Sequence, residues 1–244
     1  AYVDYQKSIW RVRGGRQALR GGLGYYLFDG ASLMVKPKRW LRVEGFAGWS
    51  RGRTINQPRT GSLLAEVENV PPDKGSTLWA LEMAARPHRS FSATFLYLRE
   101  LRTDGEALYS ERMALDAQWR GGRWLADFSS DFDWAFFHFN EARLRARYRA
   151  TNDFHREGQY RHYRPFFELW TIWGVFSPVA YNEGQLAAWW DVKQDWKLSA
   201  EGAYRKYDQA KVENEFLGLN DDGYRLRGGA HWTDGIWTAS LYAG

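Results

Sequence analysis

The sequence predicts an all-β protein of about 14 antiparallel strands, most of them about ten residues long. Apolar and polar side chains alternate with a period of two along most of the chain, as in a strand with one dry and one wet face. Turn-forming residues interrupt the alternation roughly every 12 to 20 residues, and no helical period intervenes. No run of about 18 apolar residues is present, so a helical membrane protein is excluded.

The alternation is clearest over residues 124–149. The first half places aspartates on one side and aromatic or small residues on the other. After a break at residues 136–140, a row of arginines alternates with apolar residues. Paired as an antiparallel hairpin, the two halves would set Asp127, Asp131 and Asp133 across from the arginine row. This second polar row consists of Glu141, Arg143, Arg145, Arg147 and Arg149.

The rest of the chain follows the same pattern from the N-terminus onward. Arg11 and Arg13 alternate with apolar residues, and the glycines of residues 14–24 predict a strand end and a turn. Residues 151–165 are predicted to be the longest irregular stretch, and residues 166–178 are strongly aromatic with ambiguous faces. Further strands are expected at 40–50, 63–70, 78–86, 91–101, 110–120, 183–193, 196–205, 224–232 and 237–243, with polar loops at 51–61 and 208–222.

The aromatic content favours a transmembrane barrel over a soluble sandwich of two sheets. Aromatic residues make up 17% of the chain, with 14 each of Trp, Tyr and Phe, although the mean hydropathy is only −0.60. In most strands the apolar row ends in Trp or Tyr, and its centre is expected to carry no charge. Aromatic girdles around an uncharged band are typical of a barrel that is apolar towards lipid and polar towards its lumen. We therefore expect residues 1–244 to form one outer-membrane β-barrel domain.

Charge and cysteine content narrow the class further. Cysteine is absent, which excludes disulfides, thiolate metal sites and c-type haem attachment and fits a bacterial envelope protein. The net charge is +5 and the pI about 9.3, so charges that line a pore would favour anions. The chain starts at Ala1 without Met and has no final strand ending in Phe. We expect either that a signal peptide has been removed or that the chain is part of a longer barrel.

Two short motifs near the N-terminus resemble the outer-membrane alginate-export and porin-like barrel families. They are Gly15, Arg16 and Gln17, followed by Phe28, Asp29 and Gly30. In those families a strand ending in Gly-Arg-Gln leads through a glycine-rich link and a Phe-Asp-Gly turn into another strand. The resemblance covers about the first fifth of the chain. It implies an outer-membrane channel whose cargo could be a polyanionic polysaccharide.

The candidate lumen residues are charged side chains on the wet faces of the predicted strands. They could form an electropositive pore wall, or a structural network in which Asp127, Asp131 and Asp133 neutralise the arginines. The set comprises Arg112, Asp116, Asp127, Asp131, Asp133, Glu141, Arg143, Arg145, Arg147, Arg149, Arg225 and Arg227.

Residues 154–164 interleave basic and aromatic side chains. As a loop, they could fold inward as a constriction, grip a sugar polymer, or lie exposed with their arginines against lipopolysaccharide phosphates. No nucleic-acid-binding fold accompanies them. The five histidines lack metal-ligand spacing, and nothing pairs a base with serines such as Ser129 or Ser177, so we expect no enzyme activity and no cofactor.

The sequence thus predicts a passive outer-membrane channel with a charged, net basic lumen. Its expected partners are the lipid bilayer, lipopolysaccharide, and anionic small solutes or an acidic polysaccharide. An alternative function is a structural barrel that sheathes or anchors a partner protein of a secretion or electron-transfer complex.

Overall fold

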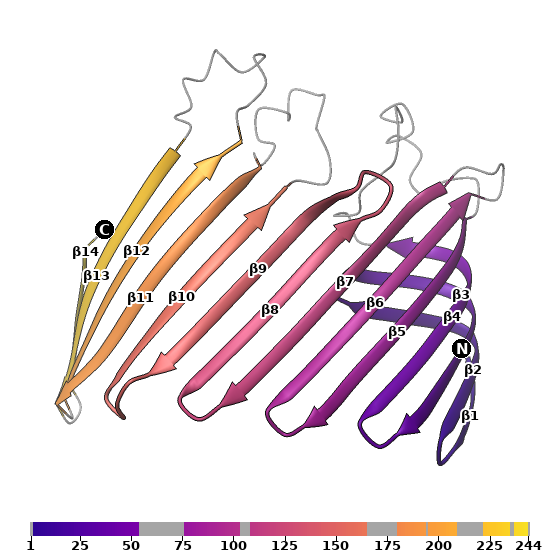
Figure 1. Ribbon diagram of the computed structural model, residues 1–244, viewed down its shortest axis with the longest axis horizontal. Helices are drawn as coiled ribbons and strands as arrows, with labels where there is room; N and C mark the ends of the chain where they lie inside the picture. Colours follow the sequence, from indigo (N-terminus) through magenta and orange to yellow (C-terminus); the bar gives the residue numbers. More distant parts are fainter. Residues whose placement is uncertain are drawn as a thin grey trace. The chain divides into compact units, whose positions relative to one another are not determined.

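The computed structural model describes residues 2–53, 76–102, 108–164, 180–193, 195–208, 222–234 and 237–243. The described residues form 14 strands that pair in sequence order into one antiparallel sheet (Figure 1). The strands are β1 (Tyr2–Lys7), β2 (Trp10–Gly21), β3 (Gly24–Lys38), β4 (Leu41–Arg53), β5 (Ser76–His88), β6 (Phe91–Arg102), β7 (Leu108–Gly121), β8 (Trp124–Asp133), β9 (His138–Arg149), β10 (Phe154–Tyr163), β11 (Tyr181–Lys193), β12 (Trp196–Tyr207), β13 (Asp222–Asp234) and β14 (Trp237–Ala243).

The predicted all-β, antiparallel architecture is confirmed. Within the described ranges, no helix has the length and apolar character needed to cross a membrane. Because each strand pairs with the next, the connections alternate between the two ends of the strands. The turns after β1, β3, β5, β7 and β9 span four residues or fewer and define the short-turn end. The opposite end, where residues 54–75 and 208–221 connect strands, is called the loop end.

Two local predictions are wrong. Residues 154–163, expected to be irregular, form β10. Their alternation was hidden because Arg156 and His162 occupy the row that is apolar in most other strands. The Phe28-Asp29-Gly30 motif lies within β3 rather than in a turn, and the chain turns at residues 22–23. The strand expected at 63–70 and the aromatic stretch 166–178 lie outside the described residues.

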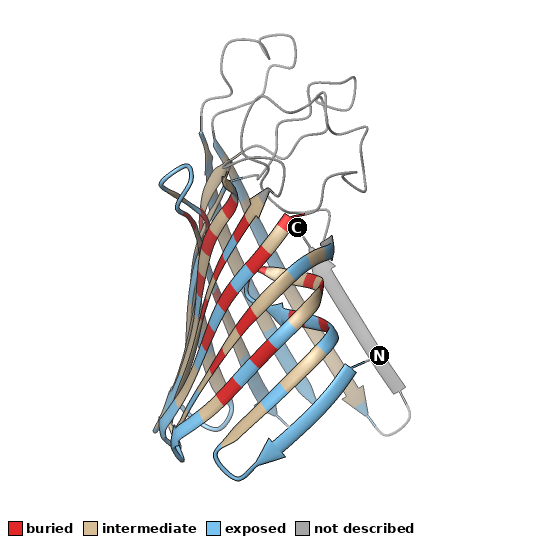
Figure 2. Ribbon diagram, turned by 90° about the vertical axis from the view of Figure 1, so that its right-hand side faces the viewer, coloured by how far each residue is buried: buried red, intermediate tan, exposed pale blue. Residues whose placement is uncertain are grey.

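Contacts divide the chain into two compact units. Unit 1 contains residues 1–117, 129–141 and 165–178, and unit 2 contains residues 118–128, 142–164 and 179–244. The prediction of a single domain stays a prediction. In unit 1 the packed face buries a cluster of apolar side chains, and Figure 2 shows buried residues recurring between exposed ones along its strands. In the described part of unit 2, the buried residues are Ala187 and Glu183.

Candidate functional site

The strands of unit 2 carry a polar face and an apolar face. The register of β10 to β13 sets His155, Glu157 and Arg161 on the same side as Glu183 and Glu201. The opposite side carries Leu186, Trp190, Leu198, Tyr204 and Leu226, all of them exposed. A soluble sheet would cover such an apolar surface, so its exposure is the main physical fact about this unit.

Among the described residues of unit 2, four carboxylate–guanidinium pairs cross the polar face. Each pair joins neighbouring strands, so the charges follow the sheet rather than a single strand. The pairs are Asp127–Arg145 at 3.0 Å, Glu157–Arg147 at 2.8 Å, Glu183–Arg205 at 2.6 Å and Glu201–Arg225 at 2.9 Å. Aromatic rings support two of the arginines: Arg205 lies 4.2 Å from the ring centre of Tyr181, and Arg147 lies 5.9 Å from that of Trp189.

Some cations on this face have no acidic partner. Within the described residues Arg143, Arg149 and Arg227 form no ion pair, and all three are exposed. The register sets Arg227 directly opposite Glu201, but the Glu201 carboxylate accepts its hydrogen bond from Arg225 instead. The paired charges cancel, so the unpaired arginines add positive charge to the polar face of unit 2.

The predicted pairing of three aspartates with the arginine row is correct only for Asp127. Asp131 binds Arg112 of β7 instead, and the amide of Asn140 donates to it over 3.4 Å. Asp133 accepts hydrogen bonds from the backbone amides of residues 135 and 136 and closes the β8–β9 turn. A short acidic residue before a turn commonly satisfies turn amides in this way.

Two further candidates lie in unit 1, on β7 and β9. Asp116 lies beside the β2–β3 turn, since a Cβ at Gly22 would be 2.7 Å from its carboxylate. Glu141 is half-buried on β9. The sequence did not single out Glu157, Glu183 and Glu201 as acidic partners, because only the strand register shows which arginine each one faces.

In unit 1 the strands β2, β3 and β4 bend sharply at a row of glycines. Gly15 pairs with Gly30, and Gly30 with Gly48. Gly15 has a φ of 121°, which side chains rarely tolerate, and a Cβ at Gly30 would lie 2.1 Å from the Ala47 carbonyl oxygen. The backbones therefore approach as closely as they do only because these positions lack side chains.

The two motifs that carry the family resemblance meet at this bend. Gly15, Arg16 and Gln17 pair in register with Gly30, Asp29 and Phe28. The Arg16 guanidinium contacts the Asp29 carboxylate at 2.8 Å, and the Gln17 side-chain amide donates to the Gly30 carbonyl over 3.1 Å. The motifs are thus two halves of one cross-strand structure.

The bend brings the tip of the β2–β3 hairpin onto the packed face of β5 to β7. Leu19 and Tyr26 of the hairpin belong to the same buried cluster as Leu96, Leu98 and Ala114. A Cβ at Gly21 would lie 2.8 Å from the Leu96 side chain. In Figure 1 the ends of β2 and β3 pass behind β6 and β7. The hairpin tip therefore covers charged residues of β7, including Arg112, which is 2% exposed.

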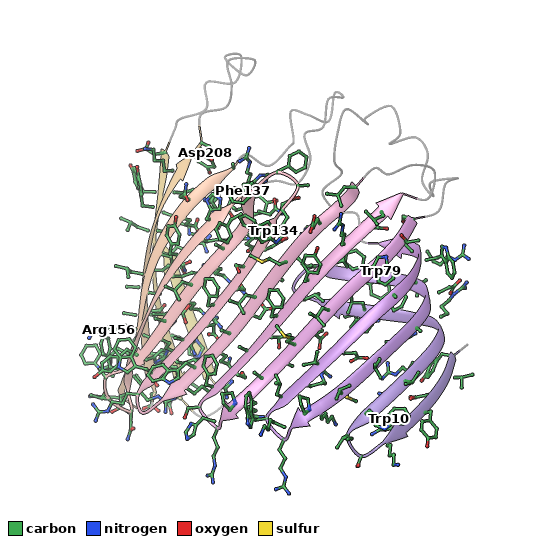
Figure 3. The ribbon with its side chains drawn as sticks, turned by 45° about the vertical axis from the view of Figure 1, so that its right-hand side comes forward. Trp10, Trp79, Trp134, Phe137, Arg156 and Asp208 are labelled. Atoms are coloured by element: carbon green, nitrogen blue, oxygen red, sulfur yellow. The ribbon has the colours of Figure 1, made fainter. Side chains whose placement is uncertain are left out.

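Aromatic side chains gather at both ends of the apolar faces. At the short-turn end of unit 2, Trp124 packs against Tyr148 with ring centres 4.5 Å apart, and Trp196 against Trp232 at 6.4 Å. In unit 1, Trp134 and Phe137 lie at the loop end in Figure 3, packed edge to face around Phe132. The predicted placement of aromatics at strand ends is confirmed for these residues.

Charged side chains also occur on the apolar rows of the described strands. In unit 1, Asp29 lies on the apolar side with Trp49, where Arg16 and Arg51 each contact it at 2.8 Å. In unit 2, Arg156 lies on the apolar side of β10. Asp29 is neutralised by a bidentate arginine pair, and Arg156 lies close to the end of its strand. Each is therefore compatible with a lipid-facing row.

The described residues contain no group of three or more His, Asp or Glu side chains arranged to hold a metal ion. His155 instead stacks on Trp189 with ring centres 4.9 Å apart, and His162 lies 2.9 Å from the Asn182 side-chain oxygen.

The fold and its two-faced strands define an antiparallel β-protein with one charged and one exposed apolar surface. No family model and no curated protein matches the sequence. Similar solved structures include Pseudomonas aeruginosa OpdQ (9% identity, TM-score 0.48, 98% of this chain and 75% of that one) and Acinetobacter baumannii OccAB4 (10%, 0.48, 99% and 69%). Another is P. aeruginosa OccK11, also called OpdR (12%, 0.45, 98% and 74%). The resemblance to alginate-export barrels stays a prediction.

Proposed function

We propose that this chain forms part or all of an outer-membrane β-barrel that acts as a passive, anion-favouring channel. The apolar faces contact lipid and the charged faces line a hydrated lumen. The observation that carries the proposal is the exposed apolar face bounded at both ends by aromatic side chains.

The dimensions of unit 2 support contact with a membrane. Trp196 and Tyr204 are eight residues apart on the apolar side of β12, and Trp232 and Tyr224 on β13 match them. Eight residues span about 26 Å along a strand. At a tilt of about 40° this gives a height of roughly 20 Å, close to the apolar band of about 25 Å in outer-membrane barrels.

The lumen assignment rests on charge. Arg143, Arg149 and Arg227 leave the polar face of unit 2 with cations that no described acid neutralises. A ring of fixed positive charge raises the local concentration of anions and lowers that of cations. In unit 1 the inward-bent β2–β3 hairpin supplies a constriction. The narrower hypothesis, an acidic polysaccharide as solute, rests only on the motifs around Gly15 and Gly30.

Planar-bilayer recording of the full chain tests this function. We expect steady conductance and, under a KCl gradient, a reversal potential shifted towards the equilibrium potential of chloride. The variant Arg143→Gln, Arg149→Gln, Arg227→Gln should lower the chloride-to-potassium permeability ratio by about twofold or more, because three unpaired charges leave the wall.

A matched control removes the same charge elsewhere. Lys38, Arg39 and Arg89 are exposed residues at or beside short turns, and their triple change to Gln should shift selectivity much less. Equal effects of the two triple variants would contradict a charged pore wall. A barrel that inserts, stays sealed and copurifies with another chain would replace the channel with the anchoring function.

A further inference from the structure

We infer that the apolar face of unit 2 contains a binding groove for one anionic phospholipid, with Arg156 holding the headgroup phosphate and a row of small residues receiving an acyl chain. This inference rests on the proposed membrane location and adds a specific lipid site to it.

The groove has a volume of about 1030 Å³ and is lined mainly by unit 2 residues of the apolar face. Its floor is one cross-strand row in which Arg156, Ala188, Ala200 and Gly228 face each other on β10 to β13. Neighbouring strands are about 4.8 Å apart, so the row runs roughly 14 Å across the sheet. Small side chains make this row a depression in a surface that is otherwise built of Leu and Trp.

Large apolar residues line the groove. On one side, Leu186 and Leu226 project from the next row and are 72% and 68% exposed. That row alternates leucine with glycine, so the leucines stand apart and leave slots between them. Elsewhere Tyr148 and Trp124, which pack against each other, line the groove beside Arg156. A flexible hydrocarbon chain fits such a groove, because it needs an apolar channel and no hydrogen-bond partner.

Arg156 gives the groove its polar end. It is exposed, it forms no ion pair within the described residues, and its guanidinium lies 5.2 Å from the ring centre of Tyr148. It is the third residue of β10 after the short turn, and Figure 3 labels it near that end of unit 2. An arginine on a lipid-facing surface is stable where it can reach a phosphate at the interface.

Charge complementarity selects the occupant. A cation at the interface with an apolar groove leading from it across the neighbouring strands matches a phosphate joined to an acyl chain. In outer-membrane barrels the short turns are periplasmic. The ligand is therefore assigned to the phospholipids of the periplasmic leaflet, and a negatively charged headgroup such as phosphatidylglycerol should bind better than a zwitterionic one.

Native mass spectrometry of the detergent-purified full chain tests the site, with titrations of phosphatidylglycerol and phosphatidylcholine. Wild type should retain one phosphatidylglycerol in preference to phosphatidylcholine. Arg156→Gln should weaken phosphatidylglycerol binding about fivefold, since one arginine near a surface accounts for about that much. Arg156→Lys, which keeps the charge, should restore part of the preference.

Two glycine variants separate the groove from the general apolar surface. Gly228 lines the groove and Gly184 lies on the same face outside it, and both have open space where a Cβ would be. Gly228→Leu should weaken binding of both lipids, and Gly184→Leu should not. Equal lipid binding by wild type and Arg156→Gln, or by the two glycine variants, overturns the lipid site. The proposed channel function would still stand if the chain conducts. A chain that is monodisperse without detergent overturns the membrane location itself.

Discussion

Unit 1 and unit 2 share the same two-faced strand pattern but differ in how far their charged side chains are buried. In unit 1 the bent β2–β3 hairpin covers the packed face, and charged groups such as Arg112 and Asp131 are buried with apolar side chains. In unit 2 the equivalent charges stay half-exposed and pair in a row across the sheet. The same residue types therefore act as structural charges in one unit and as an accessible surface in the other.

The difference comes from glycine placement rather than from charge. Unit 1 has Gly15, Gly30 and Gly48 in one cross-strand row, which allows three strands to bend together. The glycines of unit 2, such as Gly158 and Gly202, lie on the apolar face beside leucines, where they leave room in the surface without a close backbone approach. Local backbone freedom thus decides which charges are buried, and burial decides how much each charge affects stability.

The largest expected effect is the loss of the buried cation in unit 1. Arg112→Met leaves Asp131 buried beside Asn140 without its guanidinium. We expect a loss of about 3–5 kcal/mol in the free energy of unfolding, the usual result of breaking one half of a buried pair. Urea unfolding of the reconstituted protein, followed by tryptophan fluorescence, measures it.

The matched variant in unit 2 is Arg145→Met, which breaks a pair whose arginine side chain is 40% exposed. Its cost should stay below about 1 kcal/mol. The double variant Arg112→Met, Asp131→Leu should recover most of the loss, because neither member of this ion pair is then left buried without the other. Equal costs for Arg112→Met and Arg145→Met would remove the distinction between the units.

The glycine row gives the next effect in size. A Cβ at Gly48 would lie 2.5 Å from the Asp29 carbonyl oxygen, whereas a Cβ at Gly45 on the same strand meets nothing within 4 Å. Gly48→Ala should therefore destabilise the protein by about 1–3 kcal/mol through forced strand separation, and Gly45→Ala should be nearly neutral. Heat-modified gel mobility and urea unfolding of both variants provide the comparison, and a neutral Gly48→Ala would show that the bend does not depend on close approach.

A feature of the fold or site could be predicted from the sequence when it depends on residues of one strand, and could not when it depends on which strands are neighbours. The strand pattern and the aromatic strand ends are local features, so alternation along the sequence predicts them. The partners of Asp131 and Asp133 were not predictable, because they depend on which strand lies beside β8 and on how the β8–β9 turn closes. The bend was misjudged for a related reason: glycines at 14–15 fit a strand end equally well until their pairing with Gly30 is known.

The charged residues on the apolar rows were missed for a physical reason as well. Arg156 sits in a stretch rich in basic and aromatic residues, which is typical of loops, and only its register with Ala188 places it on the apolar side of a strand. The unpaired arginines of unit 2 were among the predicted lumen residues, but their separation from the paired ones required the positions of Glu157 and Glu201.

The smallest expected effect concerns the exposed ion pairs on the polar face of unit 2. Glu157→Gln releases Arg147 from its ion pair while the Trp189 ring still lies beside the guanidinium. Because the pair is exposed, stability should hardly change, but one more positive charge faces the lumen. The chloride-to-potassium permeability ratio should rise by less than about twofold, with the increase largest at low salt, where screening is weakest.

A control variant adds a charge to the same face. Gln159 lies two residues further along β10 than Glu157, so Gln159→Glu should shift the ratio in the opposite direction. Shifts of the same sign in both variants would mean that this face does not contact the conduction path, whereas opposite signs would connect the row of ion pairs to selectivity.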